Sequence, residues 1–434
     1  MRGKMRVLVI GSGGREHTLV WKLKQSRHVR AILCAPGNGG IARTARCVAL
    51  NPEDAGAVKD LIKKERIDMV VVGPEAPLAT GLVDRLTASG IGVLGPLQKA
   101  AQLESSKVFA KDFMMRHGIP TARYVTYDNP KNALAYLESS EARYPIVVKA
   151  DGLAAGKGVI VSRSAGEACE AVRRIMVERE FGSAGDRIIV EDCLKGVEAS
   201  YIVFTDGETI LPAVASQDHK AVFDNDEGPN TGGMGAYSTN DILGSELEQD
   251  VLQRIIRPAI EGMRAAGVPF QGILYAGLML TGEGPQVLEF NVRMGDPECQ
   301  VILPRLESDF FELCDAVCRT DLKSYKAVWS DGAAVCVVLA SGGYPGSYEK
   351  GKVITGLEMA EEDSRIAIFH AGTRQESDAI VTNGGRVLGV TATEKNLPSA
   401  IMLAYEAVNK IQFDEMQYRR DIGAKGLKAD RRNN

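Results

Sequence analysis

The residues best suited to chemistry lie in one glycine-rich stretch, residues 144–161. An apolar segment ends in a lysine, a glycine loop carries a second lysine, and another apolar run follows at 159–161. The lysines and glycines concerned are Lys149, Gly152, Gly156, Lys157 and Gly158. Glycine lets the backbone approach an anion because no Cβ intervenes, and lysine supplies charge that suits phosphate. The spacing is not that of a Walker A loop, which needs four residues between glycine and Gly-Lys. We predict a polyphosphate clamp on a β-hairpin flap; a mobile surface hairpin fits this stretch alone equally well.

A second chemical pattern ends a later strand, at Glu289, Asn291 and Arg293. Alternate residues of a strand share a face, so these side chains should point the same way. A carboxylate and an amide oxygen side by side are hard ligands for Mg²⁺, which also takes phosphate oxygens and water. Arg293 could then bind a transferring phosphoryl group. The competing interpretation is a salt-bridged sheet edge.

The first strand ends in Gly11-Ser12-Gly13-Gly14-Arg15, which resembles a dinucleotide-binding turn but departs from it. The third glycine of that fingerprint is replaced by Glu16, and no clear ribose-binding acid closes the next strand, which argues against a nicotinamide cofactor. A helix N-terminus with Arg15 still suits a small phosphate or carboxylate. Tight packing of strand on helix explains any single glycine here equally well.

Three further segments carry polar candidates. Lys107 falls in the first turn of a helix that Ser105 could cap, where the helix dipole mildly disfavours a cation, so a functional role gains weight. Glu198 begins a strand and could accept ribose hydroxyls while exposed main chain reads adenine, although surface solvation explains it on spacing alone. Residues 228–238 contain too many glycines for regular structure and predict an ordered loop with donors for a carboxylate or phosphate.

Composition narrows the class of protein. The chain has 434 residues, 45% hydrophobic and 25% charged, which predicts two to four domains. A net charge of −4 gives no sign of nucleic-acid binding. The eight cysteines are scattered without a C-x-x-C pair and the five histidines show no metal spacing, so we expect reduced thiols and no zinc site. No signal peptide or membrane span is evident, and we expect a cytoplasmic protein.

The order of apolar runs and turns predicts an α/β and α+β multidomain fold. Residues 1–105 alternate strand and helix, which indicates a parallel sheet with ligands at its carboxyl edge. Residues 106–330 form the central domain, in which a compact unit at about 124–192 carries the lysine loop and should act as a mobile lid. Residues 331–430 predict a separate C-terminal α/β cap.

Twelve segments in order along the chain resemble the glycinamide ribonucleotide synthetase family of ATP-grasp enzymes. They are VLVIGSGGREHTL, APGNGG, GPEAPL, QLESSK, VVKADGLAAGKGVIV, SQDHK, GPNTGGMGAYS, YAGLM, LEFNVRMGDPE, ASGGYPG, FHAGT and TNGGRVL. The resemblance covers about residues 5–425 and departs from the family pattern at Val292 and Met294, where Cys and Phe are usual. It implies an N-terminal pre-ATP-grasp domain, an ATP-grasp core with a mobile lid, and a C-terminal cap.

The resemblance also implies roles for individual residues. ATP binding is implied for Lys107, Lys149, Gly156, Lys157, Gly158, Glu191, Leu194 and Glu198. A place near the transferring phosphoryl group or the nascent intermediate is implied for Arg293, Lys220 and Asn230. Substrate binding is implied for Gly13, Gly14, Arg15, Glu75, Asp296 and Glu298, with Asp296 or Glu298 holding the glycine ammonium group. Binding of Mg²⁺ or Mn²⁺ is implied for Glu289 and Asn291.

The activity implied is ATP-dependent ligation of glycine to 5-phosphoribosylamine through glycyl phosphate, in purine biosynthesis. We expect a monomer that binds small-molecule substrates, with no nucleic acid or membrane partner and with association to other purine-pathway enzymes left open. Two alternatives stand beside this hypothesis. One is another ATP-grasp ligase, which GPNTGGMGAYS and FHAGT oppose. The other is a non-catalytic nucleotide sensor, which would not need the pair Glu289 and Asn291.

Overall fold

An N-terminal parallel sheet begins the chain in this computed structural model, which describes residues 4–154 and 157–427. Five strands lie in the order β3-β2-β1-β4-β5. Their bounds are β1 Met5–Gly11, β2 Val29–Pro36, β3 Arg46–Cys47, β4 Met69–Val72 and β5 Gly92–Leu94. The helices between them are α1 Gly14–Lys24, α2 Ala55–Glu65, α3 Glu75–Ala79 and α4 Leu82–Thr87. Strands β1 and β4 are almost wholly buried because helices cover both faces, as continuous apolar runs require.

The central sheet is antiparallel, in the order β11-β10-β16-β17. Its strands are β10 Val197–Thr205, β11 Ile210–Pro212, β16 Gly272–Thr281 and β17 Gly284–Asn291. The helices around it are α5 Gln98–Ser105, α6 Lys107–Arg116, α9 Ser245–Val251, α10 Arg257–Ala265 and α12 Phe310–Cys318, while α11 Cys299–Ile302 packs against α1. One hydrophobic cluster joins this sheet to one face of the N-terminal sheet, from Leu8 to Phe290. The two regions therefore share a core.

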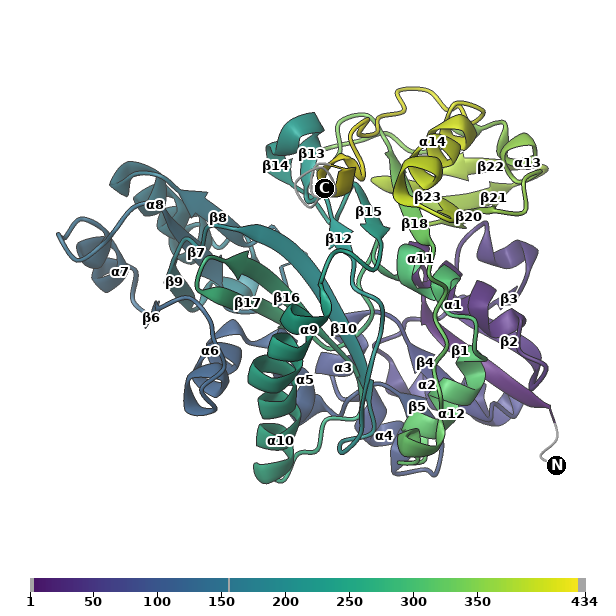
Figure 1. The fold of residues 1–434 in the computed structure, drawn as a ribbon, viewed down its shortest axis with the longest axis horizontal. Helices are drawn as coiled ribbons and strands as arrows, with labels where there is room; N and C mark the ends of the chain where they lie inside the picture. Colours follow the sequence, from purple (N-terminus) through teal and green to yellow (C-terminus); the bar gives the residue numbers. More distant parts are fainter. Residues whose placement is uncertain (1–3, 155–156, 428–434) are drawn as a thin grey trace.

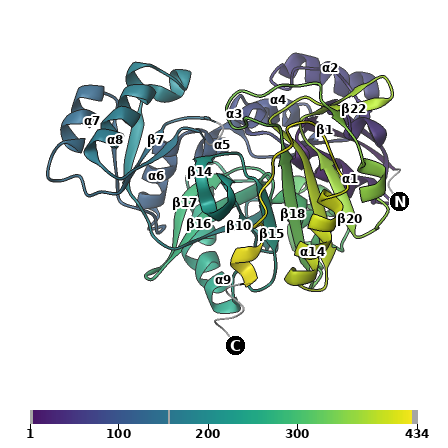
Figure 2. The same cartoon turned by 90° about the horizontal axis from the view of Figure 1, so that it is seen from above.

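The lid projects away from the rest of the molecule, at the left of Figures 1 and 2. Its sheet has the order β6-β9-β7-β8, with β6 Tyr124–Tyr127, β7 Ile146–Ala150, β8 Val159–Ser162 and β9 Ile188–Asp192. Helices α7 Pro130–Leu137 and α8 Ala165–Val172 pack on it around a separate hydrophobic cluster. Strands β7 and β8 pair antiparallel, so the lysine loop is a hairpin connection as predicted. A unit with its own core can move as one body, which suits a lid.

The C-terminal sheet recruits strands from the middle of the chain. Its order is β12-β15-β18-β23-β20, with β12 Gln217–Asp218, β15 Gly235–Ser238, β18 Ala333–Ala340, β23 Arg386–Glu394 and β20 Ile366–His370. A small sheet of β19 Val353–Ile354, β22 Ala379–Thr382 and β21 Thr373–Glu376 lies beside it, with α13 Leu357–Ala360 and α14 Leu397–Val408. The upper right of Figure 1 shows β12 and β15 meeting this region. Residues 217–238 thus connect the central region directly to the cap.

Two local predictions were wrong. Residues 228–238 are not free of regular structure, because β14 Glu227–Asn230 pairs with β13 Ala221–Phe223 and β15 pairs with β18. Long-range partners, which composition does not reveal, supply the backbone hydrogen bonds. The N-cap of α6 is Ser106 rather than Ser105, since the Ser106 hydroxyl accepts from the amide of Phe109. Lys107 begins α6, in the first turn as expected.

No helix within the described ranges is long and apolar enough to cross a bilayer. All eight cysteines are free thiols, in agreement with the prediction from their scatter.

Candidate functional site

A cavity of about 530 Å³ opens between the N-terminal region, the central sheet, the lid and the cap. Most residues selected from the sequence line it: Arg15, Glu75, Lys107, Lys149, Gly158, Glu191, Leu194, Glu198, Lys220, Asn230, Glu289, Asn291, Arg293, Asp296 and Glu298. Gly13, Gly14 and Lys157 are not among its lining residues, and Gly156 lies outside the described residues. One cavity therefore collects side chains from segments almost 300 residues apart.

The lid wall of the cavity holds a buried cation–carboxylate cluster. Lys149 on β7 forms an ion pair with Glu191 on the neighbouring β9. Lys111 on α6 reaches the other oxygen of that carboxylate at 2.6 Å and donates to the Thr121 hydroxyl at 2.7 Å. Burial alone would raise the pKa of Glu191, but the two lysines hold it below its ordinary value. Glu191 is thus ionised and fixed where the lid meets α6.

Two further lysines selected from the sequence, Lys107 and Lys157, make contacts that involve the flap loop. The Lys107 ammonium group donates to the carbonyl of Gly152 at 2.9 Å, and its pKa is lowered by burial. Lys157 is exposed and donates to the carbonyl of Pro345 in the cap at 3.3 Å. Gly158 must lack a side chain, because a Cβ there would lie 2.8 Å from the Cβ of Ala154. The flap loop therefore touches both α6 and the cap.

Glu289 is a carboxylate with several cationic side chains around it. It lies on β17 and, within the described part of the chain, makes no hydrogen bond or ion pair. Burial would raise its pKa, but Lys220, Lys149, Lys107 and Arg293 together lower it. An ionised carboxylate kept free of partners in a polar cavity can accept a cation.

Asn291 and Arg293 lie next to Glu289 and are tied to the N-terminal region. The Nη2 atom of Arg293 donates to the Oδ1 atom of Asn291 at 3.0 Å and to Glu104 at 2.7 Å. Its Nε atom lies 3.4 Å from a Glu75 oxygen. Glu104 also accepts from the Val292 amide at 2.8 Å. The end of β17 is therefore held by carboxylates of α3 and α5.

Asp218 and Lys220 influence each other's charge near the edge of the C-terminal sheet, without forming an ion pair. The Lys220 ammonium group lies 3.0 Å from Glu198, and its pKa is raised by Asp218 and Glu198 against the effect of burial. The Asp218 carboxylate makes no hydrogen bond or ion pair among the described residues. Burial raises its pKa to about 7, with Glu298 adding to the shift and Lys220 opposing it. Asp218 can therefore change charge near neutral pH.

Glu298 is held by hydroxyl groups at the floor of the cavity. Its Oε1 atom accepts from Tyr275 at 2.7 Å and from Ser200 at 3.2 Å, and its side chain is buried. These contacts leave its position fixed beside Asp218. Two carboxyl groups near one another suit an ammonium group of a small ligand.

The turn after β1 is already engaged by the protein's own carboxylates. The amide of Gly13 donates to Glu16 at 2.5 Å, and the amide of Arg15 lies 3.3 Å from Asp296. The Arg15 side chain donates to Glu16 at 2.6 Å and to the carbonyl of Met294 at 3.2 Å. An anion from outside would have to displace Asp296 or bind beside it.

The cap contributes one cation to the cavity. Arg386 on β23 donates to the carbonyls of Gly232 at 2.5 Å and Asp296 at 2.7 Å, and lies 3.3 Å from the Asp296 carboxylate. The Tyr344 hydroxyl accepts from the Gly232 amide at 3.0 Å. The glycine loop that follows Asn230 is thus fixed by the cap.

Sequence reasoning missed five of the charged residues that line the cavity: Glu104, Lys111, Asp192, Asp218 and Arg386. Lys111 stands four residues after Lys107, a helical spacing that indicates a shared face. Asp218 stands two residues before Lys220, a strand spacing that indicates the same side. No local signal marks Glu104 or Arg386, because their partners lie far away in the chain.

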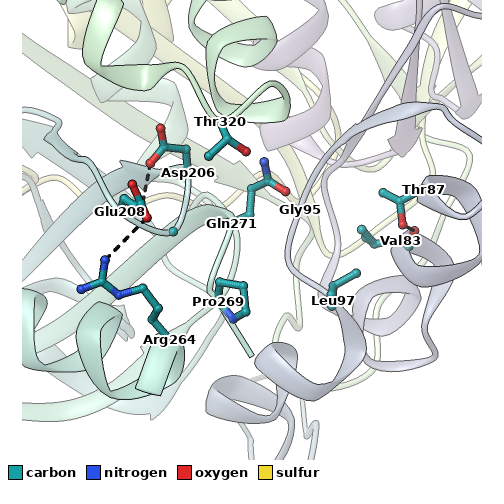
Figure 3. A pocket seen from close by; sticks show the side chains of 11 residues that line it. Val83, Thr87, Gly95, Leu97, Asp206, Glu208, Arg264, Pro269, Gln271 and Thr320 are labelled. Carbon is teal, nitrogen blue, oxygen red and sulfur yellow. Dashed lines mark hydrogen bonds and ion pairs between the residues drawn. The ribbon is translucent and has the colours of Figure 1, made fainter. Parts of the chain in front are cut away.

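A second cavity, of about 470 Å³, lies away from all of these residues. Figure 3 shows the residues that line it, which come from α4, from the end of α10, and from the segments that follow β5, β10, α10 and α12. Its Arg264 lies 3.7 Å from Glu208 in an exposed pair. Asp206 accepts from the amides of Glu208, Thr209 and Leu322 at 2.8–3.1 Å. Its charged groups are already paired.

One group of His, Asp and Glu side chains close enough for a metal ion was found among the described residues, and it lies outside both cavities. His28, Asp309 and Glu312 offer ligand atoms within 4.8 Å of one another. His28 is bonded to Glu312 at 2.7 Å, and Asp309 caps α12 by accepting from the amides of Phe311 and Glu312. Sequence spacing gave no hint of this cluster, because the histidine comes from a distant turn.

Comparison with known proteins identifies what the chain resembles over its length. Models of phosphoribosylglycinamide synthetase domains match in order: the N domain over residues 5–104, the ATP-grasp (A) domain over 105–299 and the C domain over 334–425. The chain is 49% identical over 430 residues to phosphoribosylamine–glycine ligase of Allochromatium vinosum, covering 98% of this chain and 100% of that protein. It is 51% identical over 426 residues to the trifunctional purine biosynthetic protein adenosine-3 of Gallus gallus. That match covers 97% of this chain but 42% of the avian protein.

A solved structure gives the same result for the fold. The crystal structure of phosphoribosylamine–glycine ligase from Thermotoga maritima superposes with a TM-score of 0.85 at 32% identity, covering 96% of this chain and 99% of that one. The chain thus spans less than half the length of the avian relative and nearly all of the bacterial ones.

Proposed function

The chain belongs to the phosphoribosylglycinamide synthetase family, and from that premise we propose that it ligates glycine to 5-phosphoribosylamine. The reaction converts ATP to ADP and phosphate and yields glycinamide ribonucleotide. The observation that carries this proposal is the convergence of Lys107, Lys149, Lys220 and Arg293 on a cavity that also holds Glu289. Phosphoryl transfer depends mainly on positioning and charge neutralisation, which this arrangement supplies.

ATP fits the part of the cavity between the lid and β17. Apolar side chains such as Val147, Leu194 and Met279 line that part and suit an adenine ring. The fixed carboxylate of Glu191 and the partly buried carboxylate of Glu198 suit hydrogen bonds to adenine and ribose. The polyphosphate then reaches Lys149 and Lys107, while Lys157 and the loop around it close over it from the flap.

Glu289 and Asn291 fit a divalent cation, Mg²⁺ or Mn²⁺. Both offer hard oxygen donors, and the Glu289 carboxylate has no hydrogen-bond or ion-pair partner in the described ranges. When bound there, the cation would neutralise charge on phosphate oxygens.

The chemistry then has two steps. A carboxylate oxygen of glycine attacks the γ-phosphorus of ATP, forming the P–O bond of glycyl phosphate, and the bond between the γ-phosphorus and the β–γ bridging oxygen breaks, which releases ADP. The amine of phosphoribosylamine attacks the glycyl carbonyl, an amide forms, the bond to phosphate breaks, and a proton leaves the nitrogen. Arg293 and Lys220 stabilise the negative charge of the phosphoryl group, and lid closure excludes the water that would hydrolyse the acyl phosphate.

The remaining residues form two groups, one suited to glycine and the other to the sugar phosphate. Glu298 and the neighbouring Asp218 suit the ammonium group of glycine, while Asp296 is engaged with Arg386 and the start of α1. The sugar phosphate belongs beside Arg15 and the turn at Gly13 and Gly14, with Glu75 behind Arg293. Asn230 also lines the cavity.

ADP release tests the proposal directly. Purified protein is supplied with ATP, Mg²⁺, glycine and freshly generated phosphoribosylamine, and each is omitted in turn. We expect ADP only in the presence of all four, with glycinamide ribonucleotide as the product. ADP release that ignores glycine would favour another ATP-grasp ligase, and tight ATP binding without release would favour a sensor. Cytoplasmic location and a monomeric state remain predictions.

A further inference from the structure

Glu104 is a buried carboxylate that the proposed chemistry leaves unused. It lies near the C-terminal end of α5, with about 9% of its surface exposed, next to the buried Leu103. A carboxylate in such a place is costly unless its oxygens are bonded. Both are bonded here, and both partners follow Asn291 directly in the chain: the amide of Val292 and the guanidinium group of Arg293.

The bonds form a chain that ends on an atom suited to a metal ion. Glu104 accepts from the Nη2 atom of Arg293, and the same Nη2 atom donates to the Oδ1 atom of Asn291. The Arg293 donor fixes the orientation of the Asn291 side-chain amide, because the amide oxygen can accept this hydrogen bond and the NH₂ group cannot. Asn291 Oδ1 keeps a second lone pair for a cation.

The negative charge of Glu104 also balances the positive charge of Arg293. A guanidinium group beside a cation site would repel the cation unless its charge is balanced. Glu104 at 2.7 Å and Glu75 at 3.4 Å balance Arg293, and both come from the N-terminal region. Glu104 is the nearer carboxylate, and its second oxygen is held by the Val292 amide, so Glu104 should carry most of this charge balance.

We propose that Glu104 is a positioning residue for the cation site, orienting the Asn291 amide oxygen through Arg293 and balancing the charge of Arg293 beside it. This inference rests on the proposed function, because it assigns the cation to Glu289 and Asn291. It also explains why a helix of the N-terminal region must contact the end of β17: the cation site is complete only when the two regions are docked.

Titration of Mn²⁺ by electron paramagnetic resonance tests the inference without turnover. Glu104→Gln keeps the shape of the side chain and the bond from the Val292 amide but removes the charge and the bond to Arg293. We expect Mn²⁺ affinity to fall roughly 10- to 100-fold, the usual effect of removing a partner behind a metal ligand. Glu75→Gln should have a smaller effect, because its contact is longer.

Two controls separate positioning from loss of structure. Glu361→Gln removes a carboxylate that lies 3.2 Å from Arg43 in an exposed pair outside the cavity, and it should leave Mn²⁺ affinity unchanged. ADP affinity in EDTA should stay within twofold in Glu104→Gln. If that variant does not fold, Glu104→Asp, which keeps the charge, takes its place and should lower Mn²⁺ affinity without changing that of ADP.

The outcomes divide cleanly. An Mn²⁺ affinity within twofold of the parent in a folded Glu104 variant overturns the inference, as does an equal loss of Mn²⁺ and ADP affinity. Unchanged Mn²⁺ binding in Glu289→Ala also overturns it, because the cation then lies elsewhere. A chain that shows no ligase activity but needs Glu104 for Mn²⁺ refutes the proposed function and supports the inference.

Discussion

The two cavities described above have similar volumes, about 530 and 470 Å³, but their polar groups differ in one decisive respect. In the smaller cavity, Asp206 is satisfied by backbone amides and Arg264 is paired with Glu208. In the larger one, Glu289 and Asp218 have no hydrogen-bond or ion-pair partner among the described residues. Charge left unpaired inside a protein is costly, so it indicates a ligand. Volume alone would not have separated the two.

The largest effect on activity should come from removing the charge of the Glu289 carboxylate, which has lysine and arginine side chains around it. Glu289→Gln is expected to lower kcat roughly 10²- to 10³-fold, on the scale of losing one group that stabilises a transition state. Its size is nearly unchanged, so the fold should persist. The measurement is ADP release with all substrates present, together with the melting temperature.

The matched control for this substitution is Glu283→Gln, an exposed carboxylate at the turn between β16 and β17. It should leave kcat unchanged. Near-normal turnover in Glu289→Gln would remove the cation site from this cavity and weaken the contrast with the smaller one.

The next effect concerns Asp218 and pH. Burial raises the pKa of Asp218 to about 7, so the carboxyl group is neutral below that pH and cannot pair with an ammonium group. We expect kcat/KM for glycine to fall as pH drops below about 7. Asp218→Asn should lower it about 30-fold at pH 8, since a hydrogen bond to a charged group contributes roughly 2 kcal/mol, and should abolish the dependence. A dependence that survives in the variant would assign it to another group.

The effect of Asp218 on stability should have the opposite pH dependence to its effect on activity. Its folded pKa lies above its unfolded value of 3.8, so the folded state binds more protons between about pH 4 and 7. The free energy of unfolding therefore falls as pH rises through this window, because Asp218 must lose its proton inside the folded protein. Glu298, Glu198 and Glu289 raise the pKa of Asp218 and so add to this loss, and Lys220 opposes it. The melting temperature of Asp218→Asn should exceed that of the parent at pH 8 and approach it at pH 4.

Asp218 also shows where sequence reasoning stopped. The lysine hairpin, the first strands and the Glu289 pattern were predictable, because their periodicity and glycine turns are local signals. Asp218 was within reach, because it stands two residues before Lys220, although β12 ends at Asp218 and Lys220 follows this strand. Glu104 and Arg386 were not, since Glu104 binds a residue 189 positions away and Arg386 one 90 positions away. The recruitment of β12 and β15 into the C-terminal sheet was equally hidden, because strand partners are set by tertiary packing rather than by composition.

A more selective effect is expected at Arg15. Alanine there would leave the buried Glu16 without its charged partner, at a cost of roughly 3–5 kcal/mol, so lysine is the better substitution. Arg15→Lys keeps the charge but loses the forked geometry that suits a phosphate. We expect KM for phosphoribosylamine to rise about tenfold and KM for ATP to change less than twofold, on the scale of one lost hydrogen bond to a charged group. Equal changes in both would move Arg15 out of the sugar-phosphate end.

The smallest effect should come from a substitution in the second cavity. It tests whether a cavity whose charged groups are already paired is unimportant for activity. Arg264→Ala removes a cation whose pair with Glu208, at 3.7 Å, is about half exposed on the arginine side. Such pairs contribute roughly 0–1 kcal/mol, and Asp206 keeps its three backbone donors whether or not Arg264 is present. We therefore expect kcat and every KM to stay within about twofold and the melting temperature to fall by no more than about 4 °C. A larger loss of activity in a stable Arg264→Ala protein would mean that paired charge can also mark a working site, and the criterion that separates the two cavities would fail.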